Sequence, residues 1–514
     1  MPHPKALAQI RSAPGSPYHL YDNFANNLAT GAVNGTLATS AGKNVTGTTT
    51  QRTRTVVETT AQTSITSGTL SFADGNDAYG DPILRYGAFT RTTGLMIIGE
   101  VTPNTAASQV SGLGWTNVAT PTAATDFEIL NFQCNNNRFV ARDNSSATAV
   151  GESDLVVGTT YQVCVILRGG VTGGVHWLIK GGVYKYWTLL FTNNQDSTST
   201  MYPCVLSVDN AITFRNIRVP TTCWLPVPFA DDGFALTTES TPGTRTDGQE
   251  LDGTVTDGLG HQEGAAGSGL VGGGGNGVTW SSTTGVYSVN SFSGNGKAVG
   301  SPTLGAELSS GTLTVGSWYE ITASQTNYFY TGSAVGDTFV ASAATALDAN
   351  NKVKLITLSS MFATITGPNP DNLQSVDITC GSRQQAGLVF NLDSRTDPQN
   401  FILLYVSRLG SKIWVDEYVS GTRTSLVNTA FTYGASAALR GIIQRNSTND
   451  AMIFAAYYNN VIVGSTLTTV TYNTNLLYGL FTTRSGDGTN FNSFNNWGLR
   501  PRGTANEYGF LDSL

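Results

Sequence analysis

The sequence predicts an all-β protein of more than one domain, and three observations predict it. Only 12% of the 514 residues are charged, about half the usual share. The chain holds 58 Gly, 20 Tyr, 22 Phe and 8 Trp, which suits strands joined by tight turns and differs from the composition of disordered chains. Short apolar runs such as GLMIIGEV (94–101) and YQVCVILR (161–168) recur between turn signals, as is typical of a sandwich or barrel.

The second half of the chain repeats the first half at low identity. Five segments recur in the same order with similar spacing, and that shared order predicts two copies of one β-sandwich. The pairs are SGLGW (111–115) with AGLVF (386–390), DFEILNFQCNNNRFVA (126–141) with NFILLYVSRLGSKIWV (400–415), YQVCVILRGG (161–170) with AALRGIIQRN (437–446), VHWLIKGGVY (175–184) with MIFAAYYNNVIV (452–463), and FRNIRVP (214–220) with FNNWGLRP (494–501).

The order of these segments resembles that of concanavalin A-like, or laminin G-like, jelly-roll domains. The resemblance covers residues 111–219 and 386–501. It implies an all-β fold of two concanavalin A-like jelly-roll β-sandwiches. It implies no particular activity, because one fold hosts many functions.

A different pattern lies in residues 304–356, which read as a small β-module inserted into, or placed before, the second sandwich. The pattern resembles a short module of phage tail and other virion proteins. The resemblance implies a bacteriophage virion structural protein of the tail-fibre, receptor-binding or head-decoration type. The matching residues are Val315, Gly316, Trp318, Tyr319, Ile321, Thr322, Phe329, Gly332, Val335, Gly336, Asp337, Phe339, Ala341, Ala349, Asn350, Asn351, Lys352 and Val353.

These patterns give a predicted domain organisation with six parts. They are an extended N-terminal arm (1–17), a first jelly-roll sandwich (18–225), a Gly-rich start of the second half (226–303), the inserted β-module (304–356), a second jelly-roll sandwich (357–501) and a C-terminal tail (502–514).

Charge and cysteine content limit the partners and the cellular compartment. The net charge is -7 and no block of Lys or Arg stands out, which predicts no nucleic-acid partner. No apolar run reaches the ~18 residues of a membrane span, and the first residues lack the apolar core of a signal peptide. The five widely spaced Cys residues predict buried reduced thiols rather than a zinc site or disulfides. We therefore expect assembly in the host cytoplasm and a final location in the virion.

The sequence predicts no catalytic residues. Cleavage of a glycoside by the common route needs two facing carboxylates, and the E-x-D-x-x-E strand of jelly-roll hydrolases is missing. Asp416 and Glu417 are adjacent, so they point to opposite faces of a strand. The four His residues include none beside a nucleophile motif. We expect a non-enzymatic protein.

One acidic loop is a candidate metal site. DGNDAYGD (74–81) offers Asp74, Asn76, Asp77 and Asp81, and Ca²⁺ prefers such hard oxygen ligands. Ordinary turn chemistry explains the same residues, so the alternatives stay open. We predict no other cofactor.

Glycan binding uses exposed aromatic rings together with polar side chains on loops. We predict Trp115, Trp187 and Trp497 as ring platforms, with Asn135 and Asn136 as hydrogen-bonding partners. The alternative for each Trp is a place in the sandwich core, where large aromatic side chains are common.

The favoured hypothesis is a tail-fibre or receptor-binding component that attaches to host surface glycans. Its expected partners are other virion proteins, a host surface glycan and further copies of itself in a homotrimer, with no membrane insertion. The first alternative is a capsid decoration or head-fibre protein. The second is a carbohydrate-active enzyme of jelly-roll fold, which the missing carboxylate pair and signal peptide disfavour.

Overall fold

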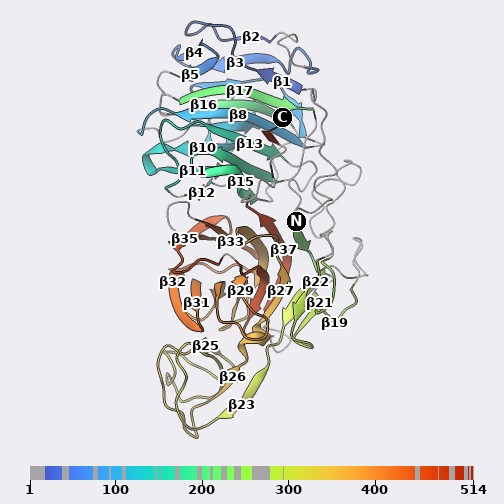
Figure 1. Ribbon diagram of the computed structural model, residues 1–514, viewed down its shortest axis with the longest axis vertical. Helices are drawn as coiled ribbons and strands as arrows, with labels where there is room; N and C mark the ends of the chain where they lie inside the picture. Colours follow the sequence, from blue (N-terminus) through green and yellow to red (C-terminus); the bar gives the residue numbers. More distant parts are fainter. Residues whose placement is uncertain are drawn as a thin grey trace. The chain divides into compact units, whose positions relative to one another are not determined.

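In a computed structural model of the protein, the described residues are 18–37, 45–72, 79–91, 94–106, 111–144, 147–151, 153–167, 174–193, 200–208, 212–221, 229–234, 236, 245–256, 278–292, 295–445, 452–472, 474–484, 492–502, 508, 511 and 512. They fold into antiparallel sheets (Figure 1). The named helical segments are short 3-10 turns: η2 (Ala124–Asp126), η3 (Cys134–Asn136) and η4 (Leu358–Met361). Among the described residues, no helix has the length and apolar character needed to cross a membrane.

The chain forms two compact units. Described residues up to 221, together with 502, 508, 511 and 512, belong to the first unit, and those from 229 to 501 belong to the second. The first unit is one β-sandwich. The second unit contains another β-sandwich and the small module.

The first sandwich consists of two sheets, which we call its back sheet and its front sheet. The back sheet has the order β15-β14-β13-β8-β17-β5-β4, with β1 also on β17, and the front sheet has the order β12-β11-β10-β9-β16-β6-β3-β2, with β7 also on β16. The back strands are β1 (Tyr18–Asp22), β4 (Thr63–Thr66), β5 (Thr69–Phe72), β8 (Leu95–Pro103), β13 (Tyr161–Leu167), β14 (Val175–Gly181), β15 (Tyr184–Asn193) and β17 (Ile212–Pro220). The front strands are β2 (Gly35–Thr36), β3 (Thr53–Val57), β6 (Ile83–Arg85), β7 (Phe89–Thr90), β9 (Ser111–Thr116), β10 (Phe127–Gln133), β11 (Arg138–Arg142), β12 (Ala147–Val150) and β16 (Thr200–Ser207).

Two tryptophans cross the interior of the first sandwich in opposite directions. The indole nitrogen of Trp115 on β9 donates to the carbonyl of Val165 on β13 at 3.2 Å. The indole nitrogen of Trp177 on β14 donates to the carbonyl of Ile129 on β10 at 3.0 Å. Because successive strand residues point to opposite faces, Trp115 marks the inward-facing positions of the front sheet.

The second sandwich also has a back sheet and a front sheet. Their orders are β19-β21-β22-β37-β28-β33-β34-β35, with β18 also on β37, and β20-β27-β36-β29-β30-β31-β32. The back strands are β18 (Ala230–Asp232), β19 (Gln249–Glu250), β21 (Tyr287–Phe292), β22 (Asn295–Gly300), β28 (Asn372–Thr379), β33 (Ala437–Arg445), β34 (Met452–Tyr458), β35 (Val461–Leu467) and β37 (Ser493–Pro501). The front strands are β20 (Ser281–Ser282), β27 (Phe362–Thr366), β29 (Gln385–Leu392), β30 (Phe401–Ser407), β31 (Lys412–Val419), β32 (Thr422–Ala430) and β36 (Leu477–Thr482).

The two sandwiches share one topology, which confirms the predicted repeat. Strands β8 to β17 correspond in chain order and in sheet position to β28 to β37. The correspondence extends to the edges, because β1 and β18 pair with the last strands β17 and β37. All five predicted segment pairs fall on equivalent strands. The all-β, two-sandwich fold class is therefore confirmed.

The small module is inserted into the second sandwich. Its four-stranded sheet has the order β23-β26-β24-β25. It follows β22 and precedes β27, which correspond to β5 and β6 of the first sandwich. The module has its own apolar cluster, which includes Tyr319, Ile321 and Phe339. Its strands are β23 (Leu304–Leu308), β24 (Trp318–Ala323), β25 (Thr338–Val340) and β26 (Lys352–Ile356).

The module packs on the outer face of the front sheet of the second sandwich. Trp318 shares an apolar cluster with outward-facing residues of β30, such as Tyr405. Its indole nitrogen donates to the hydroxyl of Tyr418 at 3.0 Å. The hydroxyl of Thr338 donates to Gln385 at 2.6 Å, and the amide of Gln385 donates back to the carbonyl of Thr338 at 2.7 Å. All residues of β30 are consequently buried.

Each sandwich contains the same buried ion pair beside its first strand. In the first unit, Arg54 on β3 donates twice to Asp22 on β1, at 2.6 Å each, and Tyr86 donates to the same carboxylate at 2.9 Å. Burial and the charge of Asp22 raise the pKa of Tyr86, so its hydroxyl stays protonated as a donor. We call this arrangement the aspartate–arginine clamp.

The clamp of the second unit repeats this geometry. Arg245 donates to the two carboxylate oxygens of Asp232 at 2.8 and 2.6 Å, and Trp280 donates to that carboxylate at 2.7 Å. In both clamps the carboxylate also accepts the backbone N–H of a phenylalanine two residues later, Phe24 or Phe234. These two residues have φ of 53° and 54°, a region that is uncommon for residues other than Gly.

The end of the chain packs on the back sheet of the first sandwich. Tyr508 and Leu511 are buried in a cluster with outward-facing residues that include Trp187. Asp512 accepts a hydrogen bond from the indole of Trp187 at 3.0 Å and pairs with Lys180 at 2.6 Å. The residues that follow the second sandwich thus complete the first one.

Replacing Arg245 by Ala is expected to lower the free energy of unfolding of the second unit by about 3–5 kcal/mol, because it leaves the fully buried carboxylate of Asp232 without its cation. Lys352→Ala is the matched control within the same unit. Lys352 and Glu307 are 29% and 41% exposed, and exposed pairs contribute about 0–1 kcal/mol. Urea denaturation followed by tryptophan fluorescence measures both variants. Equal losses would contradict the structural importance of the clamp.

Candidate functional site

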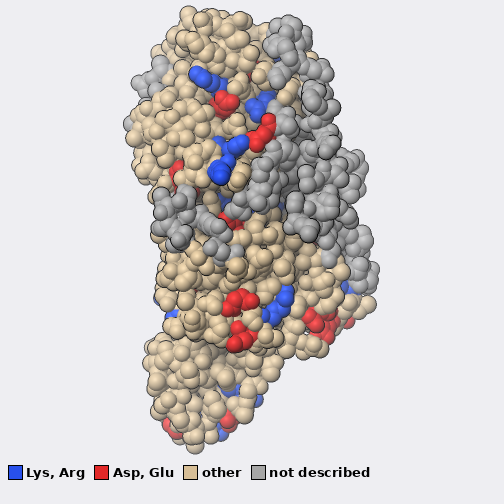
Figure 2. All heavy atoms as spheres, in the orientation of Figure 1, with Lys and Arg blue, Asp and Glu red and all other residues tan. Residues whose placement is uncertain are grey.

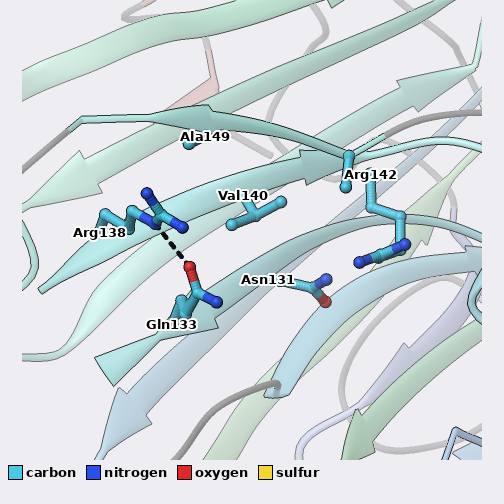
Figure 3. Close-up of a pocket in the computed structure, with 7 residues that line it drawn as sticks. Asn131, Gln133, Arg138, Val140, Arg142 and Ala149 are labelled. Atoms are coloured by element: carbon cyan, nitrogen blue, oxygen red, sulfur yellow. Dashed lines mark hydrogen bonds between the residues drawn. The ribbon is translucent and has the colours of Figure 1, made fainter. Parts of the chain in front are cut away.

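A cavity of about 140 Å³ opens on the outer face of the front sheet of the first sandwich. Strands β10, β11 and β12 provide its walls (Figure 3). Successive side chains of a strand point to opposite faces of the sheet. The lining side chains occupy the positions whose face is opposite to that of Trp115, so they point away from the interior. The lining residues are Asn131, Gln133, Arg138, Val140, Arg142, Ala147 and Ala149.

The strand register explains the hollow. Asn131 lies opposite Val140, which in turn lies opposite Ala149. These side chains are short, whereas the longer Gln133 and Arg138 face each other at one end and Arg142 lies at the other. Short side chains in the middle of a row of longer ones leave room for a ligand.

Asn131 is the most unusual residue of the cavity. Its side chain is only 1% exposed, and among the described residues neither its amide oxygen nor its amide nitrogen has a hydrogen-bond partner. A buried amide without partners costs about 1–3 kcal/mol. Figure 3 shows the amide directed toward the space between Val140 and Arg142. The arrangement is what a site built to hydrogen-bond a ligand requires.

Two half-buried arginines make the cavity cationic. Arg138 donates through Nε to the side-chain oxygen of Gln133 at 2.5 Å. The guanidinium of Arg142 lies over the ring of Tyr79, 5.1 Å from its centroid. Its buried Nε has no hydrogen-bond partner in the part of the chain that the structure describes. Burial raises the pKa of Tyr79 despite the opposing effect of Arg142, so this ring stays neutral.

In the second sandwich, large side chains fill the position that is equivalent to the cavity. By register, Tyr405 lies opposite Trp414 on β30 and β31, as Asn131 lies opposite Val140 on β10 and β11. The hydroxyl of Tyr405 donates to Asp416 at 2.7 Å, and Arg423 pairs with that carboxylate at 2.8 Å. Large rings and a paired charge thus replace the cavity, and the module packs over the rings.

The three tryptophans predicted as glycan platforms are buried, so this prediction is wrong. Trp115, Trp187 and Trp497 are each 0% exposed and present no ring face to solvent. Each ring fills a core and satisfies its nitrogen internally. Their indole nitrogens donate to Val165, Asp512 and Gln374, respectively.

The predicted asparagines lie beside the cavity rather than in it. Asn135 and Asn136 are exposed in η3, the turn that joins β10 to β11, between Gln133 and Arg138. Sequence reasoning missed Asn131 and Arg142. The repeat contained a usable signal, because the alignment of 126–141 with 400–415 sets Asn131 against an aromatic residue, Tyr405.

The acidic loop predicted as a calcium site falls largely outside the described residues. Asp74, Asn76 and Asp77 lie there, and Asp81 uses its carboxylate to accept the backbone N–H of Thr59 at 2.9 Å and the hydroxyl of the same residue. In the described part of the chain, no three His, Cys, Asp or Glu side chains are grouped to hold a metal. Calcium binding stays a prediction.

The described cysteines are buried free thiols, as predicted. They are Cys134, Cys164, Cys204 and Cys380, while Cys223 lies outside the described residues. Burial raises the pKa of Cys380 to about 12, so this thiol is not ionised near neutral pH and is a poor nucleophile.

Comparisons with known proteins give remote structural likenesses. No family model matches the sequence, and no curated protein matches it either. A carbohydrate-binding module, CBM66 from Bacillus subtilis, is 14% identical over 27% of this chain and 81% of its own, with a TM-score of 0.22. Lectin I-B4 from Griffonia simplicifolia is 12% identical over 32% of this chain and 91% of its own, with a TM-score of 0.25. An endo-1,3-beta-glucanase from Streptomyces sioyaensis is 12% identical over 41% of this chain and 98% of its own, with a TM-score of 0.24. Likenesses at this level carry no argument about function.

Replacing Asn131 by Leu is expected to raise the free energy of unfolding of the first unit by about 1–3 kcal/mol, because an apolar side chain removes a buried amide that has no partner. Gln374→Leu is the matched control. The amide of Gln374 is equally buried, but it donates to Val389 at 2.8 Å and accepts from Trp497 at 3.1 Å, so its loss should destabilise the second unit. Urea midpoints measure both changes, and a destabilised Asn131→Leu variant would contradict the prediction.

Proposed function

We propose that this protein is a non-enzymatic glycan-binding protein whose ligand lies in the cavity of the first sandwich. The buried amide of Asn131, with no partner and directed into the cavity, carries the proposal. A protein rarely keeps such a group in place unless a ligand or water completes its hydrogen bonds. In the second sandwich the protein itself satisfies the equivalent Tyr405.

The chemistry of the lining supports a saccharide. A sugar presents hydroxyl groups, which donate and accept, and C–H faces, which are apolar. The amides of Asn131 and Gln133 offer donors and acceptors, and Val140 and Ala149 offer apolar contact. The volume of about 140 Å³ is below the ~300–1,000 Å³ of drug-sized sites, which suits one sugar residue of a longer chain.

The lining also supports binding without cleavage. The common mechanism of glycoside hydrolysis needs two carboxylates on either side of the bond. The residues that line the described cavity include neither Asp nor Glu. In the second unit, Asp416 accepts a hydrogen bond from Tyr405 and forms an ion pair with Arg423. Glu417 accepts a hydrogen bond from the hydroxyl of Thr469.

A bulky side chain at the edge of the cavity should abolish glycan binding. Ala147 is exposed on the edge strand β12, so Ala147→Trp is expected to cover the cavity and leave the fold intact. Ala430→Trp is the matched control, because Ala430 is exposed on the equivalent edge strand β32. A glycan array of the wild type and both variants measures retention. Retained binding in Ala147→Trp, or shortening of the bound glycans on prolonged incubation, would contradict the proposal.

We also propose that the protein is a bacteriophage virion component, with host surface glycans and other virion proteins as its partners. The residue pattern of the module at 315–353 supports this assignment. Tyr319, Ile321 and Phe339 of that pattern form the apolar cluster of the module. The favoured role is a tail fibre or receptor-binding protein, and capsid decoration is the alternative.

Electron microscopy of purified particles with antibody against this chain tests the virion assignment. Label at the tail or its tip is expected for a receptor-binding protein. Label spread over the capsid would favour decoration instead. Particles without label would contradict the virion assignment while leaving glycan binding intact. Crosslinking of the separately purified protein tests the predicted homotrimer.

A further inference from the structure

We infer that the ligand of the cavity is an acidic saccharide whose anionic group, a carboxylate or a sulfate, binds the guanidinium of Arg142. The inference rests on the proposed function and adds the chemical class of the ligand.

On strands β9 to β12, no acidic residue shares the face of the sheet that carries Arg142. Strands β9 to β12 carry two arginines, Arg138 and Arg142, and one acidic residue, Glu128. Glu128 lies opposite Trp115 in the register and is 0% exposed, so it points into the interior and away from the cavity. On the face shown in Figure 2, charged side chains lie in small separate groups among uncharged residues. Within these strands, Arg142 therefore has no acidic residue on its side of the sheet, and its charge favours an anion.

The position of Arg142 leaves its donors available to a ligand. The ring of Tyr79 supports one face of the guanidinium, which limits the motion of the side chain. Among the described residues, Arg142 has no ion pair, and its buried Nε has no hydrogen-bond partner. A planar guanidinium fork matches the two oxygens of a carboxylate or sulfate. An anion here would both balance the charge and complete the hydrogen bonds.

The second sandwich shows how the protein treats a charge at this position when no ligand is needed. The alignment of the repeats, continued by one residue, places Asp416 where the first sandwich has Arg142. Asp416 is 0% exposed and pairs with Arg423 at 2.8 Å. The fold therefore neutralises its own charge in one copy and leaves Arg142 for an external counter-ion in the other.

Asn131 extends the recognition beyond the charge. It lies two residues from Gln133 on β10, on the same face of the sheet. Its amide faces the space beside Arg142 (Figure 3). An anionic group held by Arg142 would bring the ring of the same sugar over Asn131, where ring hydroxyls meet an amide that can donate and accept.

A glycan array that pairs acidic glycans with their neutralised derivatives tests the inference. The acidic members carry uronic acids, other carboxylated sugars or sulfates, and the derivatives are methyl esters or desulfated forms. We expect the wild type to retain acidic members and to lose about tenfold or more in affinity when the charge is removed. Loss only on esterification assigns a carboxylate, and loss only on desulfation assigns a sulfate.

Two variants connect the result to Arg142. Arg142→Gln is expected to weaken binding of the acidic glycan about 10- to 100-fold, because hydrogen bonds to charged groups are the strong ones. Arg85→Gln is the matched control: Arg85 is also half-buried on the front sheet, lies over a tyrosine ring at 5.2 Å and has a buried Nε without a partner. It lies on β6, away from the cavity lining, and should bind as the wild type does.

The outcomes separate the inference from the proposed function. Retention of neutral glycans, or equal affinity after neutralisation, would overturn the acidic ligand and leave glycan binding standing. Equal losses in Arg142→Gln and Arg85→Gln, or equal binding of a single-stranded oligonucleotide, would reduce the effect to general charge attraction and also overturn it. Failure of the folded wild type to retain any glycan would overturn the proposed function itself.

Discussion

The aspartate–arginine clamp is the interaction on which both sandwiches depend. Asp22 and Asp232 lie on the strands β1 and β18, which pair with the last strands of their sandwiches. Each carboxylate accepts two hydrogen bonds from an arginine, and in the first unit this arginine belongs to the opposite sheet. In the first unit the clamp therefore fixes the back sheet to the front sheet beside the first strand. Removal of either partner leaves an isolated buried charge, so a pair of this kind is costly to break.

The two sandwiches keep one framework and use the front sheet differently. Equivalent strands occur in the same order, and even the turn between β10 and β11 matches that between β30 and β31, with φ near 50° at Asn137 and Ser411. One front sheet carries Asn131, Val140 and Arg142 around a cavity. The other carries Tyr405, Trp414 and Asp416 at the corresponding positions and lies under the module. One copy thus has an open cavity on its front sheet, and the other copy supports a further domain there.

The sequence predicts the fold better than the site. Strand alternation and the order of repeated segments can both be read directly from the sequence, so the two sandwiches were predictable. The wide spacing of the cysteines likewise predicted the free thiols. The burial of Trp115 and Trp497 was not, because an aromatic residue on a strand has the same pattern whether its ring faces the core or the solvent. The clamps were missed because Asp22 and Arg54 are distant in sequence. Asn131 was missed because it interrupts an apolar strand by a single residue, and only the register shows which face it joins.

The packing of Tyr508 and Leu511 on the first sandwich determines when that sandwich can be completed during synthesis. The back sheet exposes Ile98, Leu178 and Leu189 until Tyr508 and Leu511 have been synthesised, because these residues form one cluster. The second unit has all its strands by residue 501, so it can fold while the first still lacks its cover. Domains usually fold in N-terminal to C-terminal order. Here the unit that is translated first reaches its final packing only after the second unit has been synthesised, and a chain that stops before Tyr508 exposes this apolar cluster.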